Sequence, residues 1–146
     1  MTTYIAEPYV GALPLKFGMS PDTVAALLGP PRAVFPHPLG GLIEARTNLS
    51  LLYTGDSKEL LDITISTGAS LVFRGVDLFM VEDLIAHLSE FDPDPYEWVG
   101  FLIFLQLGFR LAGFHNVNHS QQAIGIVARG YFDPFISQFT PWKGKT

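Results

Sequence analysis

The most constraining stretch of this sequence is a short segment whose helical ends are marked by local chemistry. Ser20 is a favourable N-cap, and Pro21 suits the first helical position, where a missing N–H costs nothing. Gly29, followed by two prolines, ends the helix, so we predict a helix over residues 21–28. Its apolar stripe consists of Val24, Leu27 and Leu28. A helix of two turns is too short to be stable alone, and we expect it to pack on a sheet.

The composition indicates one globular domain of 146 residues. Hydrophobic residues make up 48% of the chain and charged residues only 16%, which excludes a disordered protein. Cysteine is absent, so we expect no disulfide, no thiolate metal site and a cytoplasmic location. The N-terminus has no basic region before an apolar one, and the longest apolar run, residues 99–105, is far below the ~20 residues of a membrane helix. We therefore expect no membrane partner.

Strand patterns occur in two groups along the chain. The first group comprises an edge strand at 33–35 and strands at 49–53, 61–66 and 71–73, which we expect to form an antiparallel meander. The second group comprises runs at 98–107, 109–114 and 122–129. Residues 101–105 are apolar on both faces, which favours an interior strand. A helix is the alternative there, because a short apolar run cannot be assigned by periodicity.

A second helix is predicted over residues 81–89, with Glu82 and Asp83 in its first turn. Its sequence overlies the first helix at a shift of sixty residues, which suggests two weak helix-plus-strands repeats. Near the C-terminus, Asp133 and Pro134 are typical of a helix start, and we expect the phenylalanines that follow to dock on the core. The predicted fold class is α+β, an antiparallel sheet with two or more short helices packed on one face.

Residues 18–31 also carry a motif, Gly-Met-Ser followed by a central Val24 and then Leu-Gly-Pro-Pro. It resembles the Gly-Met-Ser-x-x-x-Val-x-x-x-Leu-Gly-x-Pro pattern of small bacterial α+β proteins. These include the β-lactamase inhibitor protein, small outer-membrane assembly lipoproteins, and immunity-type proteins encoded beside toxins. The resemblance implies an α+β fold and a binding or inhibitory role. The chain departs from the pattern because it has neither a lipoprotein cysteine nor the cysteine pairs of the secreted inhibitor.

The formal charge of −5 argues against a nucleic-acid partner. Seven of the fourteen carboxylates lie between Arg74 and Arg110, a stretch without any Lys or Arg. We therefore expect a basic, toxin-like protein partner, attracted by these charges and anchored by neighbouring aromatic residues. The predicted partner-binding residues are Glu90, Asp92, Asp94, Tyr96, Glu97 and Trp98. The alternative is that long-range ion pairs neutralise the acids and that Trp98 belongs to the core.

The sequence contains no recognisable catalytic motif, and we assign no catalytic residue and no cofactor. His115 and His119 have the i, i+4 spacing of a helical metal site, with Asp133 as a distant third ligand. The residues between them form helices poorly, so we predict a polar loop without a metal. Two functions stay open. One is a non-catalytic binding or inhibitory protein, such as an immunity protein. The other is a small enzyme or ligand-binding domain with a site between sheet and helices, using these histidines and nearby carboxylates.

Overall fold

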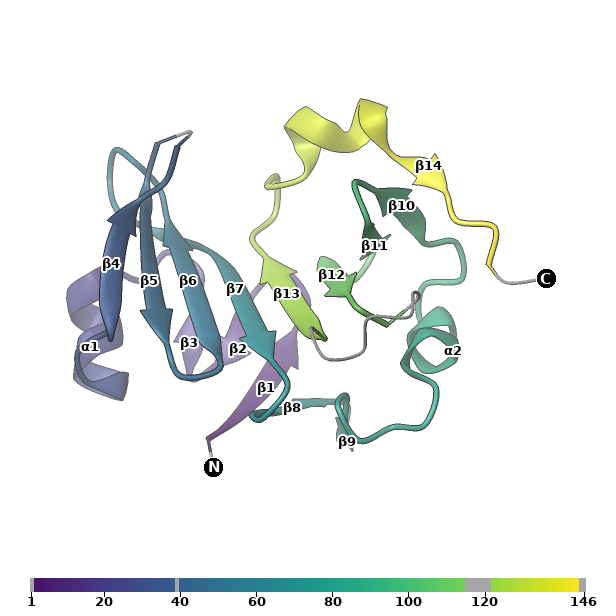
Figure 1. Cartoon of the computed structure of the whole chain (residues 1–146), viewed down its shortest axis with the longest axis horizontal. Helices are drawn as coiled ribbons and strands as arrows, with labels where there is room; N and C mark the ends of the chain where they lie inside the picture. Colours follow the sequence, from purple (N-terminus) through teal and green to yellow (C-terminus); the bar gives the residue numbers. More distant parts are fainter. Residues whose placement is uncertain (1, 39, 115–121, 145–146) are drawn as a thin grey trace.

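The computed structural model of the chain describes residues 2–38, 40–114 and 122–144, and it shows the α+β fold that the sequence predicts (Figure 1). The strands form two sheets, one of nine strands and one of five. The nine-stranded sheet has, in spatial order, the strands β14 (Thr140–Pro141), β10 (Tyr96–Trp98), β11 (Phe101–Phe104), β12 (Phe109–Ala112), β13 (Ala123–Val127), β7 (Leu60–Ser66), β6 (Leu49–Tyr53), β5 (Leu42–Arg46) and β4 (Ala33–Pro36). Every neighbouring pair in it is antiparallel.

The smaller sheet brings the N-terminus beside the middle of the chain. Its spatial order is β3 (Leu15–Lys16), β2 (Gly11–Leu13), β1 (Thr3–Glu7), β8 (Ser70–Phe73) and β9 (Val76–Asp77). Strands β1 and β8 pair in parallel, the one parallel pairing of named strands among the described residues. The prediction that residues 71–73 continue the first meander is therefore wrong. The chain leaves the large sheet after β7, and β8 instead completes the small one.

The order of elements repeats along the chain. The helix α1 (Pro21–Leu28) precedes the four-stranded meander β4 to β7, and the helix α2 (Leu84–Ser89) precedes the four-stranded meander β10 to β13. The two meanders join where β7 pairs with β13, so that Thr64 lies opposite Gly125. This arrangement agrees with the helix-plus-strands repeat that the sequence suggests.

Helix α1 has the predicted bounds because the residues at both of its ends form the expected caps. The Thr23 backbone N–H donates to the hydroxyl of the N-cap Ser20 over 3.2 Å, and Gly29 ends the helix with a φ of 83°. Helix α2 is shorter than predicted, and its start at residue 81 is wrong. Asp83 is the N-cap rather than a first-turn residue, because its carboxylate accepts a hydrogen bond from the Ala86 N–H over 3.1 Å.

Two strand assignments differ from the expectation and two agree with it. The predicted strand 98–107 is two strands, β10 and β11, separated by a turn in which Val99 and Gly100 both have positive φ. Strand β11 lies inside the sheet and is not helical, as favoured for residues 101–105. Strand β5 falls in a stretch for which we predicted no strand. Its partner β4 is the predicted edge strand and carries Pro36, which suits an edge because proline donates no ladder hydrogen bond.

The main core lies on one face of the nine-stranded sheet. Alternate residues of the central strands point into it, including Ile63 and Ile65 of β7 and Ile124 and Ile126 of β13, all fully buried. Both α helices contribute side chains to the same core, so the helices pack on one face as predicted. Among the described residues, no helix is long and apolar enough to cross a membrane.

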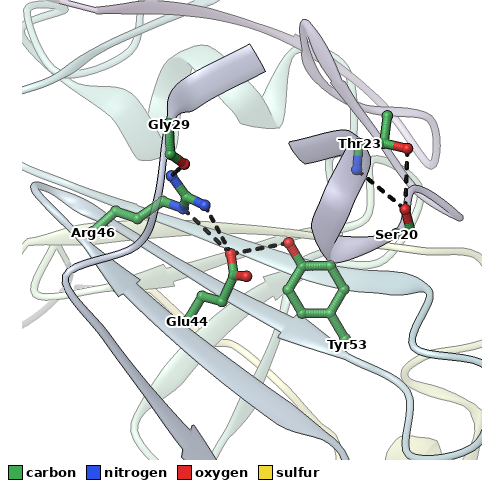
Figure 2. Close-up of polar contacts among 6 residues, drawn as sticks. All are labelled: Ser20, Thr23, Gly29, Glu44, Arg46 and Tyr53. Atoms are coloured by element: carbon green, nitrogen blue, oxygen red, sulfur yellow. Dashed lines mark hydrogen bonds and ion pairs between the residues drawn. The ribbon is translucent and has the colours of Figure 1, made fainter. Parts of the chain in front are cut away.

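A buried polar cluster ties α1 to this core face (Figure 2). The Glu44 carboxylate accepts hydrogen bonds from Arg46 over 3.1 Å and from the Tyr53 hydroxyl over 3.0 Å. The same guanidinium donates to the carbonyl of Gly29 at the end of α1, over 2.8 Å. Burial raises the pKa of Tyr53, and the charge of Glu44 raises it further, so the hydroxyl stays a donor. The cluster satisfies a buried charge and a helix carbonyl together.

We predict that Glu44→Ala lowers the free energy of unfolding by about 3–5 kcal/mol, because it leaves the buried guanidinium of Arg46 without its counter-ion. Chemical denaturation measures this loss. The double variant Glu44→Leu with Arg46→Leu should lose clearly less, since no buried charge is then left unpaired. A Glu44→Ala variant within about 1 kcal/mol of the wild type would contradict this account of the cluster.

Candidate functional site

The second face of the nine-stranded sheet is the candidate site, and we call it the open face. Strand alternation places on it the residues that do not enter the main core: Ser50, Leu52, Asp62, Thr64, Arg110, Ala112, Ala123 and Gly125. In the described part of the chain, the α helices pack on the other face, and the 3₁₀ helix η2 (Asp133–Gln138) packs beside this one. Most of these side chains are small, so the face is hollowed.

An ion pair crosses the centre of the open face. The guanidinium of Arg110 donates to both carboxylate oxygens of Asp62, over 3.0 and 3.1 Å, and to the Thr64 hydroxyl over 2.8 Å. Both charged side chains are largely buried, with exposed fractions of 12% for Arg110 and 9% for Asp62. Burial by itself lowers the pKa of Arg110, but the charge and hydrogen bonds of Asp62, together with those of Tyr131, raise it by more. The two charges therefore neutralise each other at the floor of the hollow.

The ion pair requires a glycine between its partners. Arg110 belongs to β12 and Asp62 to β7, and the strand between them, β13, presents Gly125 at the crossing point. A Cβ atom on this residue would lie 2.5 Å from a terminal nitrogen of Arg110 and 2.7 Å from the central guanidinium carbon. Only the absence of a side chain on β13 lets the guanidinium lie flat across the strand.

The side chain of Tyr131 contacts the ion pair. Its hydroxyl interacts with both Asp62 and Arg110. Burial raises the pKa of Tyr131 and the charge of Asp62 raises it further, while Arg110 opposes this. The ring of Phe101 also lies against the guanidinium, with its centroid 5.5 Å from the guanidinium carbon. The centre of the open face is thus a network of fixed geometry.

Three adjoining hollows of about 320, 140 and 440 Å³ surround Tyr131. The first lies over the ion pair and reaches Trp98. The second lies over Ser50 and shares Asp62 and Thr64 with the first. The third reaches the arginine that follows β13, Arg129. All three border Tyr131, which separates them, and we call the three hollows together the groove.

Aromatic side chains form one rim of the groove. The tail, residues 131–144, leads from β13 to β14 (yellow in Figure 1) and packs η2 onto β10. The rings of Trp98 and Phe135 stack with centroids 4.8 Å apart, and the Trp98 indole donates to the Gln138 side chain over 3.0 Å. Phe139 packs on Tyr96 and Trp98. The tail phenylalanines dock on the sheet, as predicted.

The opposite rim is apolar and more exposed. Phe35 of the edge strand β4 is 47% exposed, and its register partner Ile43 lines the groove beside Leu52. Neighbouring Val34 is 49% exposed but points to the other face of the same strand. The open face therefore combines two apolar rims with a polar floor whose central ion pair is neutral, and Arg129 adds a cation at one end.

The predicted partner-binding residues lie in three separate parts of the structure. Tyr96 and Trp98 lie on the open face under the tail. Asp92 is 2% exposed and accepts a hydrogen bond from the Gln106 N–H over 2.9 Å, so its carboxylate has a structural role. The exposed acids Glu90, Asp94 and Glu97 do not line the groove, and Glu97 points away from it along β10. A contact between these acids and a partner stays a prediction.

The histidines of the metal hypothesis, His115 and His119, lie outside the described residues. Within residues 2–38, 40–114 and 122–144, no three His, Asp or Glu side chains gather closely enough to hold a metal ion. The absence of a metal therefore stays a prediction. Buried apolar side chains such as Leu84 and Leu88 pack between the sheet and the helices, and hollows of about 240 and 440 Å³ border α2 beside Phe114, so a ligand site between sheet and helices stays a prediction. The groove lies on the opposite face.

Sequence reasoning missed Asp62, Arg110, Gly125 and Tyr131. Three of the four have a signal in hindsight, and Tyr131 has none. Asp62 and Arg110 are single charges inside strands that are otherwise largely apolar, and Gly125 interrupts a strand of β-branched residues. A glycine within a strand indicates a close approach by another group. Only the strand pairing shows which group this is, because it brings the Arg110 guanidinium across Gly125 to Asp62, 48 residues away in the sequence.

Comparisons with known proteins identify no relative of this chain. No family model, curated protein or solved structure matches the chain.

We predict that Gly125→Ala lowers the free energy of unfolding by about 2–3 kcal/mol, because the added methyl group displaces the guanidinium of Arg110. In a chain that already carries Arg110→Ala and Asp62→Ala, the same substitution should cost less than about 1 kcal/mol, since the methyl group then has room. Thermal or urea unfolding of the four chains measures both values. Equal costs in the two backgrounds would show that Gly125 does not serve the ion pair.

Proposed function

We propose that this protein is a non-catalytic binding protein that receives a basic protein partner on the open face of the nine-stranded sheet. The observation that carries the proposal is the groove itself. It crosses a sheet face that has apolar rims, a polar floor with a neutral ion pair at its centre, and no α helix packed on it among the described residues. Exposed apolar side chains such as those of the rims are typical of interaction sites.

The shape of the groove supports a macromolecular partner. The three hollows together extend from Trp98 to His37, across several strands, which suits a protruding loop or strand of another protein. The ion pair in the floor is already satisfied, so a partner that covers it need not supply a counter-charge. Apolar anchors such as Phe35 and the aromatic rim would provide the energy of binding.

The negative charge of the chain supports a basic partner. The chain carries −5, and exposed carboxylates lie in the β6–β7 turn, at Asp56 and Glu59, and near β10, at Asp94 and Glu97. Such charges raise the association rate with a cationic surface without contributing much to the lifetime of the complex. An immunity-type role against a toxin, and action in the cytoplasm, rest on the resemblance of residues 18–31 and on the absence of cysteine.

The proposal is tested with two variants of neighbouring residues on the edge strand β4. Once a partner has been isolated with the purified chain as bait and identified, its binding is measured with purified components. We predict that Phe35→Asp weakens binding at least about thirtyfold, as expected for an interface anchor. Val34→Asp should change binding less than about threefold, because Val34 is equally exposed but faces the other way.

The same measurement tests the charge of the partner. The association rate should fall as ionic strength rises from about 0.05 to 0.5 M, while the dissociation rate changes little. A partner that binds Phe35→Asp and the wild type equally well would contradict docking on the open face. An association rate independent of salt would contradict the basic partner.

A further inference from the structure

The third hollow differs from the other two because it is lined by an arginine, Arg129, that has no carboxylate partner among the described residues. It has a volume of about 440 Å³, within the range of small-molecule sites, which is about 300–1,000 Å³. Its apolar lining comes from Leu52 and Leu61 of the sheet and from Pro134 and Phe135 of the tail, and His37 and Tyr131 also line it. We call this hollow the Arg129 cleft.

The guanidinium of Arg129 is held by an aromatic ring and not by a carboxylate. Its central carbon lies 4.5 Å from the centroid of the Tyr9 ring, and the Tyr9 hydroxyl donates to the carbonyl of Leu105. In the described part of the chain, Arg129 forms no ion pair. A stacked guanidinium keeps its N–H donors in the plane of the fork, so they remain available to an acceptor.

The cleft therefore combines an apolar body with one positioned cation. A carboxylate matches the planar fork of arginine through two parallel hydrogen bonds. An apolar group attached to that carboxylate would replace water along Leu52, Leu61 and Phe135. The exposed carboxylate of Asp133, four residues after Arg129, would compete with a ligand carboxylate for this guanidinium. Its charge also acts on Tyr9.

We propose that the Arg129 cleft binds a small carboxylic acid with an aromatic or branched apolar body, and that the carboxylate pairs with Arg129. The ligand is a free small molecule, because the cleft has the volume of a small-molecule site and its two sides are formed by the sheet and the tail. This site is additional to protein docking on the open face. Its test uses no protein partner, so either proposal can fail without the other.

The test is an NMR titration of the full-length ¹⁵N-labelled chain with two probes of the same shape. The probes are 3-phenylpropionate and its neutral amide, 3-phenylpropionamide. We expect the acid to bind in the millimolar range and to shift the amide signals of Leu52, Leu61 and Gly130. The acid should bind at least about fivefold more tightly than the amide, because only the acid makes charge-assisted hydrogen bonds with the arginine.

Three variants separate the contributions to binding. Arg129→Gln should remove the preference for the acid, whereas Arg32→Gln, at an exposed arginine that does not line the groove, should retain it. Asp133→Asn should bind the acid at least as tightly as the wild type, because it removes the competing carboxylate. Any of three results would overturn the proposal: equal binding of acid and amide, an unchanged preference in Arg129→Gln, or no shift in the cleft up to about 50 mM of the acid.

Discussion

The open face depends on one interaction, the guanidinium of Arg110 lying across β13 to reach the carboxylate of Asp62. Because Asp62 belongs to the first meander and Arg110 to the second, the ion pair joins the two repeats across the seam at which β7 pairs with β13. It also requires a glycine at position 125, where the guanidinium crosses β13. The neighbouring small residues and this glycine leave the groove above the ion pair, and Tyr131 divides it into its three hollows.

Buried charge is used differently on the two faces of the sheet. On the core face, Glu44 and Arg46 belong to the same strand, and Arg46 also holds the end of α1, so this pair organises one repeat internally (Figure 2). On the open face, the pair bridges the repeats and remains at the floor of a hollow. A satisfied pair at such a place costs little to cover, whereas a lone charge would repel an apolar partner. The geometry thus suits a binding surface.

The sequence predicted those parts of the fold that depend on local chemistry. Helix α1 has the expected bounds because Ser20, Pro21 and Gly29 act within a few residues of one another. The strands around residues 49–53 and 60–66 follow from their apolar patterns. The departure of β8 to the second sheet could not be predicted, since parallel pairing with β1 is decided by contacts between distant segments. The same holds for the site. An acidic run is visible in a sequence, but the partners of Asp62 are known only when the strand order is known.

The central claim, that a protein partner covers the open face, is tested most directly by side-chain footprinting of the complex with hydroxyl radicals. Oxidation rates of single residues are compared between the free chain and the chain bound to its purified partner. The account predicts that Phe35, Leu52 and Tyr131 become protected, because all three border the groove. Leu27 on α1 and Met80, which are 48% and 80% exposed on other surfaces, should keep their rates. Protection of Leu27 or Met80 with unchanged oxidation of Phe35, Leu52 and Tyr131 would contradict it.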